Sequence, residues 1–423
     1  MIGIESWDWQ EGKKVLTNLE QIQKQYSRID EFVASPDGEK FAALVKNDNG
    51  GFTACVNGVA WPESFELSWY LRFSPLGQLI ALVRIDDQWT LAVDGVPWEE
   101  RFEYAWNPKF SVEGKAIGLL YKRDNMYGLA VNGRPWKEGF LAIRDFCLSP
   151  DGTKSAATVQ VEELKEADIF KFLEGVWSVA VEGKAWDKKF INVWNPAFND
   201  NGSSVAAEIR TDICDYSIAV DAQAWPVMFD CVWSPLFRPQ NSSVIAPVRM
   251  AGGWTLAEDG KPIWNGRYNQ IWQVKFSPDG SRLAAIVSPD FGRWTIAVND
   301  LPWKKTFGDM VQAPVFSSDN LRVAAIVKED NRWTIAVDGV AWKEDFDMIW
   351  DPVFSPCGKH IITKAQAGGK FLVIVDGKSC RKSYDALWQP VFSLDGKMVL
   401  LRYIEDNNYF RQVVSFEKLL DHT

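Results

Sequence analysis

Three carboxylates stand at equivalent places in a repeating pattern, and they are the side chains best suited to chemistry. Glu31, Asp145 and Asp351 each come four residues before a turn motif, as in the SPDG at 35. The equivalent residues elsewhere are mostly amides, phenols or hydroxyls: Tyr70, Asn107, Asn195, Ser234, Gln273, Ala313 and Gln389. A pair of carboxylates is enough for glycoside hydrolysis, and a ring of acids and amides can hold waters, a cation or a small ligand. The candidate ring comprises Glu31, Asn107, Asp145, Asn195, Gln273, Asp351 and Gln389, with a merely polar strand end beside solvent as the simpler alternative.

Other kinds of active site find little support in the residues. The chain has two histidines, His360 and His422, and contains no GxSxG, HExxH, Walker or GxGxxG motif. Its six cysteines show no CxxC or CxxCH spacing, which disfavours zinc, iron–sulfur and covalent haem ligation. We therefore expect no catalytic histidine, no metal ligands and no cofactor.

Composition limits the partners and the location. A formal net charge of −10 disfavours nucleic acid and anionic lipid as partners. The first residues, MIGIESWDWQEGKK, lack the regions of a secretory signal, and no run of about 18 apolar residues is present to span a bilayer. We expect a cytoplasmic protein that reaches a membrane only through partner subunits.

Internal repetition dominates the sequence. The six residues RWTIAV occur at 293–298 and again at 332–337. Turn motifs related to SPDG begin at 35, 74, 111, 149, 199, 238, 277, 317, 355 and 393. Their starts lie 37 to 40 residues apart, except for one interval of 50 residues across the fourth unit. The chain is therefore built from ten units of nearly constant length.

Each unit predicts four short antiparallel strands. Asp-Gly and Asn-Gly pairs supply the turns between strands, since glycine accepts a positive φ without steric cost. Four strands per forty residues or so indicate a blade of a β-propeller. We predict an all-β chain, 1–423, forming a single propeller of ten blades in one ring rather than two rings of five. The tenth unit lacks a fourth strand, so residues 1–30 are predicted to close the last blade, with Tyr26 at the fourth-strand aromatic position; residues 31–423 hold the repeats.

The tryptophans follow the same repeat. Twenty of the 22 open the third strand, follow the Asp-Gly turn or precede the first strand. A large flat side chain at a fixed place in each blade packs one sheet on the next. Only Trp7 and Trp9 stand outside the pattern, either as an N-terminal anchor on the propeller or as a contact with a partner.

The long interval reflects an insertion at 161–175, VEELKEADIFKFLEG. Leu164, Ala167, Phe170 and Leu173 recur every third residue between acids, which predicts a short amphipathic helix on the rim. Its apolar face either packs on its own propeller or docks a partner, for which Leu164, Phe170 and Leu173 are the candidate contacts.

The motifs FSPDG at 276–280 and FSPCG at 354–358 resemble the WD40-like repeats of the TolB-type propeller family over nearly the whole chain. TolB is periplasmic, whereas no signal is visible here. The WTIAVDGxxW unit at 333–342 is also similar to the tryptophan-rich subunit of the transmembrane redox complex of sulfate-reducing bacteria. This second resemblance implies an accessory protein without a cofactor that binds cytochrome and iron–sulfur subunits.

The repeats, the missing motifs and the resemblance favour a non-catalytic scaffold for protein interactions, as an accessory subunit of a membrane-associated electron-transfer complex. Two alternatives remain open. One is an enzyme such as a glycosidase, with Glu31, Asp145 and Asp351 in the channel. The other is a propeller that binds a carbohydrate or small ligand without chemistry.

Overall fold

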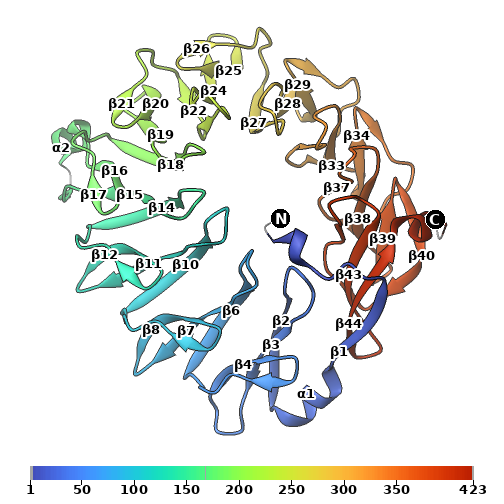
Figure 1. Cartoon of the computed structure of the whole chain (residues 1–423). Coiled ribbons are helices and arrows are strands. Elements are labelled where there is room, and N and C mark those ends of the chain that lie inside the picture. The colour runs from blue at the N-terminus through green and yellow to red at the C-terminus, as the bar shows by residue number, and fades with distance from the viewer. Residues whose placement is uncertain (1–2, 167, 422–423) are drawn as a thin grey trace. The chain divides into compact units, whose positions relative to one another are not determined.

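The computed structural model describes residues 3–166 and 168–421 and folds them into ten antiparallel sheets. Each sheet is one blade, and the blades follow one another in chain order, as predicted (Figure 1). The described helices are short: η1 (Ile4–Ser6), α1 (Leu19–Gln25), α2 (Ile169–Glu174) and α3 (Phe416–Asp421). Two residues named in the sequence analysis, Ala167 and His422, lie outside the described residues.

The first strand is continuous in six blades and divided in four. The continuous strands are β2 (Arg28–Ala34), β6 (Leu67–Phe73), β10 (Tyr104–Phe110), β14 (Ala142–Leu148), β18 (Asn192–Phe198) and β27 (Gln270–Phe276). The divided strands are β22 (Cys231–Val232) with β23 (Leu236–Phe237), β31 (Met310–Val311) with β32 (Val315–Phe316), β36 (Met348–Ile349) with β37 (Val353–Phe354), and β41 (Ala386–Leu387) with β42 (Val391–Phe392).

The second and third strands carry the buried centre of every blade. The second strands are β3 (Phe41–Lys46), β7 (Leu79–Ile85), β11 (Ile117–Arg123), β15 (Ser155–Gln160), β19 (Val205–Arg210), β24 (Val244–Met250), β28 (Leu283–Asp290), β33 (Val323–Glu329), β38 (Ile361–Ala367) and β43 (Met398–Glu405). The third strands are β4 (Phe52–Val56), β8 (Gln88–Val93), β12 (Met126–Val131), β16 (Trp177–Val181), β20 (Tyr216–Val220), β25 (Gly253–Glu258), β29 (Arg293–Val298), β34 (Arg332–Val337), β39 (Lys370–Val375) and β44 (Asn408–Ser415).

The fourth strand is short in most blades. In order these strands are β5 (Val59–Ala60), β9 (Val96–Pro97), β13 (Arg134–Pro135), β17 (Lys184–Ala185), β21 (Gln223–Ala224), β26 (Lys261–Pro262), β30 (Leu301–Pro302), β35 (Val340–Ala341), β40 (Lys378–Tyr384) and, in the tenth blade, β1 (Gly12–Asn18). In eight blades an isolated bridge then joins the aromatic that opens the third strand to a second aromatic, as in Trp89 with Phe102.

The first turn of the unit is held by its serine. Ser149 Oγ donates to Asp151 Oδ1 at 2.6 Å and accepts the Lys154 N–H at 2.9 Å. This hydroxyl and the neighbouring N–H groups stabilise the charged carboxylate, which lowers the pKa of Asp151 to about 2. Ser277 with Asp279 and Ser393 with Asp395 repeat the arrangement, so the SPDG motif encodes a hydrogen-bonded turn.

A second hydrogen bond ties the third-to-fourth strand turn to the start of the second strand. Asp94 has φ of 48°, and its Oδ1 accepts the Leu79 N–H at 2.9 Å. Eight other blades make the equivalent bond, with acceptors Asn57, Asn132, Glu182, Asp221, Asp259, Asn299, Asp338 and Asp376. Asn and Asp tolerate the left-handed backbone better than most residues, which explains why the turn begins with them.

The tryptophan after this turn packs on the next blade. A Cβ on Gly95 would lie 2.9 Å from Cγ of Trp61 in the preceding blade, and one on Gly377 would lie 2.7 Å from Cγ of Trp342. Both glycines also have positive φ, so any side chain there would be strained and would displace the indole. The turn glycine and the tryptophan of the preceding blade therefore form one packing unit.

The tenth blade is closed by the N-terminal segment, as predicted. β1 pairs antiparallel with β44, from Gly12 opposite Val413 to Asn18 opposite Asn408 (Figure 1). The prediction that Tyr26 takes the fourth-strand aromatic position was wrong. That position lies opposite the aromatic that opens the third strand, Tyr409 in this blade, and Thr17 occupies it. Helix α1 intervenes, and Tyr26 packs instead beside Cys55 of blade one.

Buried arginines of blade ten hold the first turn of blade one. Arg411, 2% exposed, donates from Nε to the Asp37 carbonyl at 2.9 Å and pairs with Glu39 at 2.9 Å. Tyr409 OH donates to the Gly38 carbonyl at 3.0 Å. These contacts satisfy carbonyl groups that would otherwise be buried without donors.

The contacts between blades decide between one ring and two. Two rings of five would separate blade five from blade six and blade one from blade ten. Ala206 and Ile218 of blade five instead pack with Val232 of blade six, and the rings of Phe41 and Tyr409 lie 4.8 Å apart between blades one and ten. Blade five therefore joins blade six and blade one joins blade ten, which excludes two separate rings of five and agrees with the predicted single ring.

By the density of its contacts the chain divides into two compact units. One comprises Met1–Arg84, Ala92–Pro97 and Lys275–Thr423 and contains the closing strand. The other comprises Ile85–Leu91 and Trp98–Val274 and contains the insertion.

Replacing Arg411 with methionine tests the closure. The change removes the buried donor from the Asp37 carbonyl and the closer of the two cations paired with Glu39, so we expect the free energy of unfolding to fall by about 3 kcal/mol. Urea denaturation measures the change. Arg381→Met, at an exposed arginine of blade nine, is the control and should shift stability by less than about 0.5 kcal/mol. Equal effects of the two variants would contradict this account of the closure.

Candidate functional site

The candidate ring residues lie at an irregularity of the first strand. The register of this strand shifts around Glu31, Asn107, Asp145 and Asn195, and in the divided strands Asp351 and Gln389 lie in the gap between the two halves. A β-bulge turns one side chain away from the regular alternation. Accordingly, the exposed members of the ring are Asn107, Asp145, Asn195, Gln273 and Asp351, whereas Glu31 and Gln389 are half-buried.

Several bulge residues have a left-handed backbone. The φ values are 53° at Asn107, 49° at Asn195 and 53° at Gln273, and Glu31 and Tyr70 are also positive at 27° and 61°. Amides adopt this conformation more readily than most residues. The backbone conformation of the bulge is thus enough to explain why Asn occurs here, without a bound ligand.

Glu31 is engaged in a contact between blades. Its carboxylate accepts the N–H groups of Tyr70 at 3.1 Å and Leu71 at 2.9 Å, and Arg72 Nη1 lies 3.2 Å from Oε2. The carboxylate therefore holds the bulge of the second blade. Gln389 similarly donates from Nε2 to the Asp351 carbonyl at 2.8 Å, which joins the bulges of blades nine and ten.

The structure shows charged residues inside three blades that sequence reasoning missed. The fourth residue of the second strand is apolar in most blades but is Glu208, Lys364 or the equivalent Arg402 in three. Lys364 Nζ donates to the Leu387 carbonyl of the next blade at 2.9 Å, and burial lowers the pKa of this lysine to about 8. Arg402 donates to the Ser35 carbonyl at 2.9 Å. In the sequence, these residues could have been found as single charged residues inside otherwise apolar strands, as in VAAEIR at 205–210.

Glu208 is the buried acid of this group. It is 6% exposed and accepts a hydrogen bond from Asn195 Nδ2 at 3.1 Å. Desolvation raises the pKa of Glu208 to about 7, and the hydrogen bond from Asn195 offsets this effect only in part. Burial and the neighbouring Glu208 charge also raise the pKa of Cys231 in the next blade. Asn195 is thus the candidate ring residue that binds this buried acid.

Aromatic residues flank the ring. Among the tryptophans of the repeat, those just before the bulge are the more exposed, as in Trp69 at 38%, Trp233 at 39% and Trp272 at 36%. Trp233 stacks on Trp254 with ring centroids 5.3 Å apart and planes 4° apart. Most tryptophans of the other two classes are buried or half-buried between blades, in keeping with their predicted architectural role.

The two tryptophans outside the repeat pack near the closing blade. Trp7 and Trp9 stack with centroids 6.0 Å apart, and Trp9 Nε1 donates to the Ile4 carbonyl at 2.9 Å. Both contact a cluster of Ile4, Val391, Leu400 and Val413. Two roles were considered for Trp7 and Trp9, and this packing is the one expected of an N-terminal anchor.

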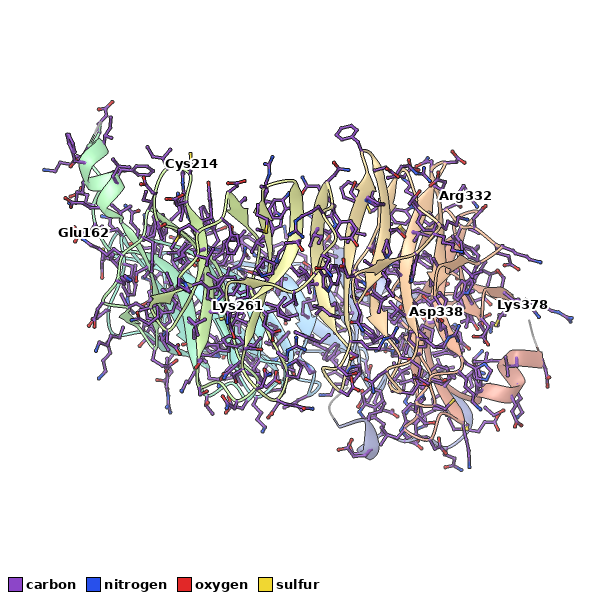
Figure 2. The ribbon with its side chains drawn as sticks, turned by 90° about the horizontal axis from the view of Figure 1, so that it is seen from above. Glu162, Cys214, Lys261, Arg332, Asp338 and Lys378 are labelled. Carbon is purple, nitrogen blue, oxygen red and sulfur yellow. The ribbon has the colours of Figure 1, made fainter. Side chains whose placement is uncertain are left out.

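The insertion forms a shorter helix than the sequence indicated. Helix α2 begins at Ile169, with Asp168 Oδ1 accepting the Lys171 N–H at 3.1 Å, so Leu164 lies outside it. None of the helix residues is buried, and Phe170 is 84% exposed. The alternative in which the helix buries its apolar face on its own propeller is therefore wrong. The helix projects beyond the strands at the rim where Cys214 lies (Figure 2).

His360 lies in a turn and not in a catalytic arrangement. Its Nδ1 is 2.7 Å from Asp376 Oδ2, the acid that also accepts the Ile361 N–H. Within residues 3–166 and 168–421, no group of three or more His, Cys, Asp or Glu side chains is placed to hold a metal ion. Among the same residues, none of the helices has the length and apolar character needed to cross a bilayer.

Replacing Glu208 with glutamine tests the buried acid. A carboxyl whose pKa rises on folding costs stability as pH rises from its ordinary value of 4.5 to about 7, because the folded state must then release a proton it binds tightly. The glutamine variant lacks this cost. We expect its stability relative to the parent to rise by about 2 to 3 kcal/mol between pH 5 and pH 8 in urea denaturation. The exposed Glu174→Gln serves as control, and a pH-independent difference would contradict the assignment.

Comparisons with known proteins identify no family: no protein-family model and no curated protein matches the chain. Among solved structures, one described as the crystal structure of the eukaryotic initiation factor matches 79% of this chain and 92% of that chain, with 14% identity and a TM-score of 0.48. The Dos1 propeller matches 96% of this chain and 94% of that chain, with 11% identity and a TM-score of 0.37. At these identities and TM-scores, neither similarity assigns a function to this chain.

Proposed function

We propose that the chain is a non-catalytic scaffold for protein interactions and that the insertion at 161–175 contacts a partner. The observation that carries the proposal is the exposure of large apolar side chains there: Leu164 is 40% exposed, Ile169 65%, Phe170 84% and Leu173 37%. Exposed apolar groups gathered on one segment are typical of an interaction surface. The insertion interrupts only the fourth of ten otherwise similar units.

The hydrogen bonds that two of the candidate ring residues, Glu31 and Asn195, make within the protein support a role without catalysis. Glu31 accepts three donors from the neighbouring blade, and Asn195 donates to Glu208. A carboxylate held in this way has little freedom to exchange a proton or attack a substrate. Glu31 and Gln389 therefore join neighbouring blades, and Asn195 binds an acid of its own blade.

For the biological setting, we propose an accessory subunit of a membrane-associated electron-transfer complex on the cytoplasmic face. The similarity of the WTIAVDGxxW unit at 333–342 to the tryptophan-rich redox subunit supports this setting, and the FSPDG pattern supports a WD40-like origin. A net charge of −10 opposes direct adsorption to anionic lipid. Attachment through cytochrome and iron–sulfur subunits is consistent with that charge.

Exchange of Phe170 and Leu173 for serine tests the proposal. The tagged protein is captured from solubilised host membranes and analysed by mass spectrometry and by visible absorption for haem and iron–sulfur bands. The parent should recover these subunits, and the double variant should recover at least tenfold less, because apolar contacts at the centre of an interface dominate its affinity.

The matched control is Phe291→Ser, at a residue 96% exposed in the equivalent turn of blade seven, which should leave recovery unchanged. Deletion of 162–174 should reproduce the loss. Recovery of a colourless propeller alone would overturn the redox setting and favour a search for glycan binding or hydrolysis at Glu31, Asp145 and Asp351. Undiminished recovery by both insertion variants would overturn its role in docking.

A further inference from the structure

Blades four and five carry exposed apolar residues where other blades have short polar turns. In blade four, Ile169, Phe170 and Leu173 are exposed on α2, which projects beyond the strands (Figure 2). In blade five, Ile213 is 57% exposed in the turn 211–215, on the same rim of the propeller (Figure 2). In seven of the other eight blades, the turn between the second and third strands holds only Asp, Asn, Gly or Ala. The repeat itself therefore does not require the apolar residues of blades four and five.

Packing beneath the rim brings the insertion and this turn together. Val176 and Trp177 directly follow the insertion and belong to one buried cluster with Ile209, which lies two residues before the turn. Met228, 40% exposed, also contacts the turn, with its sulfur 3.4 Å from Oγ1 of Thr211. The insertion, the turn and Met228 are together called the rim patch, and all lie in one compact unit of the chain.

The rim patch is acidic. Its seven carboxylate residues outnumber its two lysines, Lys165 and Lys171, and two further cations, Lys189 and Arg210, stand beside it. Glu162 pairs with both Lys171 and Lys189, at 3.4 and 3.3 Å, and the guanidinium of Arg210 donates to carbonyl groups of the turn. Even with these flanking cations the patch keeps a net negative charge. Among the residues that the structure describes, no ion pair joins a cation to the six other acids of the patch, which are Glu163, Glu166, Asp168, Glu174, Asp212 and Asp215.

We propose that the rim patch binds a basic amphipathic helix of a partner protein. The apolar face of such a helix would rest on Ile169, Phe170 and Ile213, and lysines or arginines beside that face would pair with the acids around them. Met228 suits this surface because its unbranched side chain adapts to the shape of a partner. The inference rests on the proposed scaffold role and specifies the chemistry of the partner at the same surface.

Other kinds of partner fit the rim patch less well. An extended peptide that adds a strand needs a free sheet edge, but β16 and β20 are each paired on both sides in their sheets. A nucleic acid, an acidic peptide and an anionic bilayer all carry the same sign of charge as the patch. A cationic partner with one apolar face matches both features of the patch, its exposed apolar groups and its excess of acids.

Binding of a model helix by the full-length protein tests the inference. The probe is a fluorescein-labelled peptide of about 18 residues, with leucines on one helical face and lysines on the other. We expect fluorescence anisotropy to show binding that weakens as salt rises from about 50 to about 200 mM, because the attraction is partly electrostatic. A counterpart with glutamate in place of lysine should bind at least about tenfold more weakly. Equal binding of the two peptides would overturn the proposal.

Charge reversals locate the binding. Glu163→Lys combined with Asp215→Lys reverses one acid from each blade of the rim patch and should weaken the lysine peptide at least about tenfold. Asp48→Lys combined with Asp290→Lys alters the net charge equally, at exposed acids in or beside the corresponding turns of blades one and seven, and should weaken binding less than about twofold. Equal losses in the two double variants would indicate attraction by the overall charge alone and would count against the patch.

Two further measurements test the apolar contact and the position of the peptide. Ile213→Ser leaves the charge unchanged and should weaken the lysine peptide at least about fivefold, because an apolar contact is lost. A chloroacetyl group at the end of the peptide should alkylate Cys214 in the patch, as read by mass spectrometry. Cys357 is also exposed, and the Ser355 hydroxyl lowers its pKa, which favours its reaction wherever the peptide binds. Alkylation of Cys357 alone would place the peptide elsewhere and refute the assignment.

The outcomes separate this inference from the proposed function. If the lysine peptide does not bind but Phe170 and Leu173 are still needed to capture membrane subunits, the helix inference is wrong and the docking role of the insertion stands. If the peptide binds and no subunit is captured, the helix inference stands and the redox setting is wrong. Sedimentation of the protein with phosphatidylserine vesicles, lost on Phe170→Ser, would make the patch a lipid contact and overturn the inference.

Discussion

Nine of the ten blades share one hydrogen bond, in which the N–H that begins the second strand donates to the side chain that begins the turn between the third and fourth strands. Asp94 and its counterparts make this bond from a left-handed backbone, and the residue after them is also left-handed and is glycine in seven of the nine blades. That glycine is where the tryptophan of the preceding blade packs, as Trp61 does on Gly95. The polar turn and the aromatic repeat are therefore two consequences of one local geometry.

The bulges of the first strands impose a second constraint, because they leave carbonyl groups at the junction between blades. Lys364 donates to the Leu387 carbonyl beside such a bulge, and Arg402 donates to the Gln389 carbonyl at the bulge of its own blade. Glu31 accepts N–H groups in the same kind of place. The polar residues named here therefore serve to bind backbone groups at these junctions. Glu208 differs, since burial and one amide donor leave its carboxyl poised to take up a proton.

The blade count, the turns and the closing strand could be predicted because each follows from a repeated local pattern. The position of Tyr26 could not, since the helix α1 that displaces it depends on the Asn18 cap and on packing against blade one. The contacts of Glu31 were also beyond prediction, because they join different blades and the spacing along the chain does not report distance between sheets. The bond between Asn195 and Glu208 lies within blade five and depends on the bulge in its first strand.

The pairing of β1 with β44 has a consequence for the order of folding. Asn18 and Asn408 form a hydrogen bond across 390 positions of sequence, so the closing strand emerges from the ribosome long before its partner is made. Until then β1 has no strand of its own sheet to pair with. Closure of the tenth blade therefore waits until β44 has been made, and it joins two segments that are far apart in sequence.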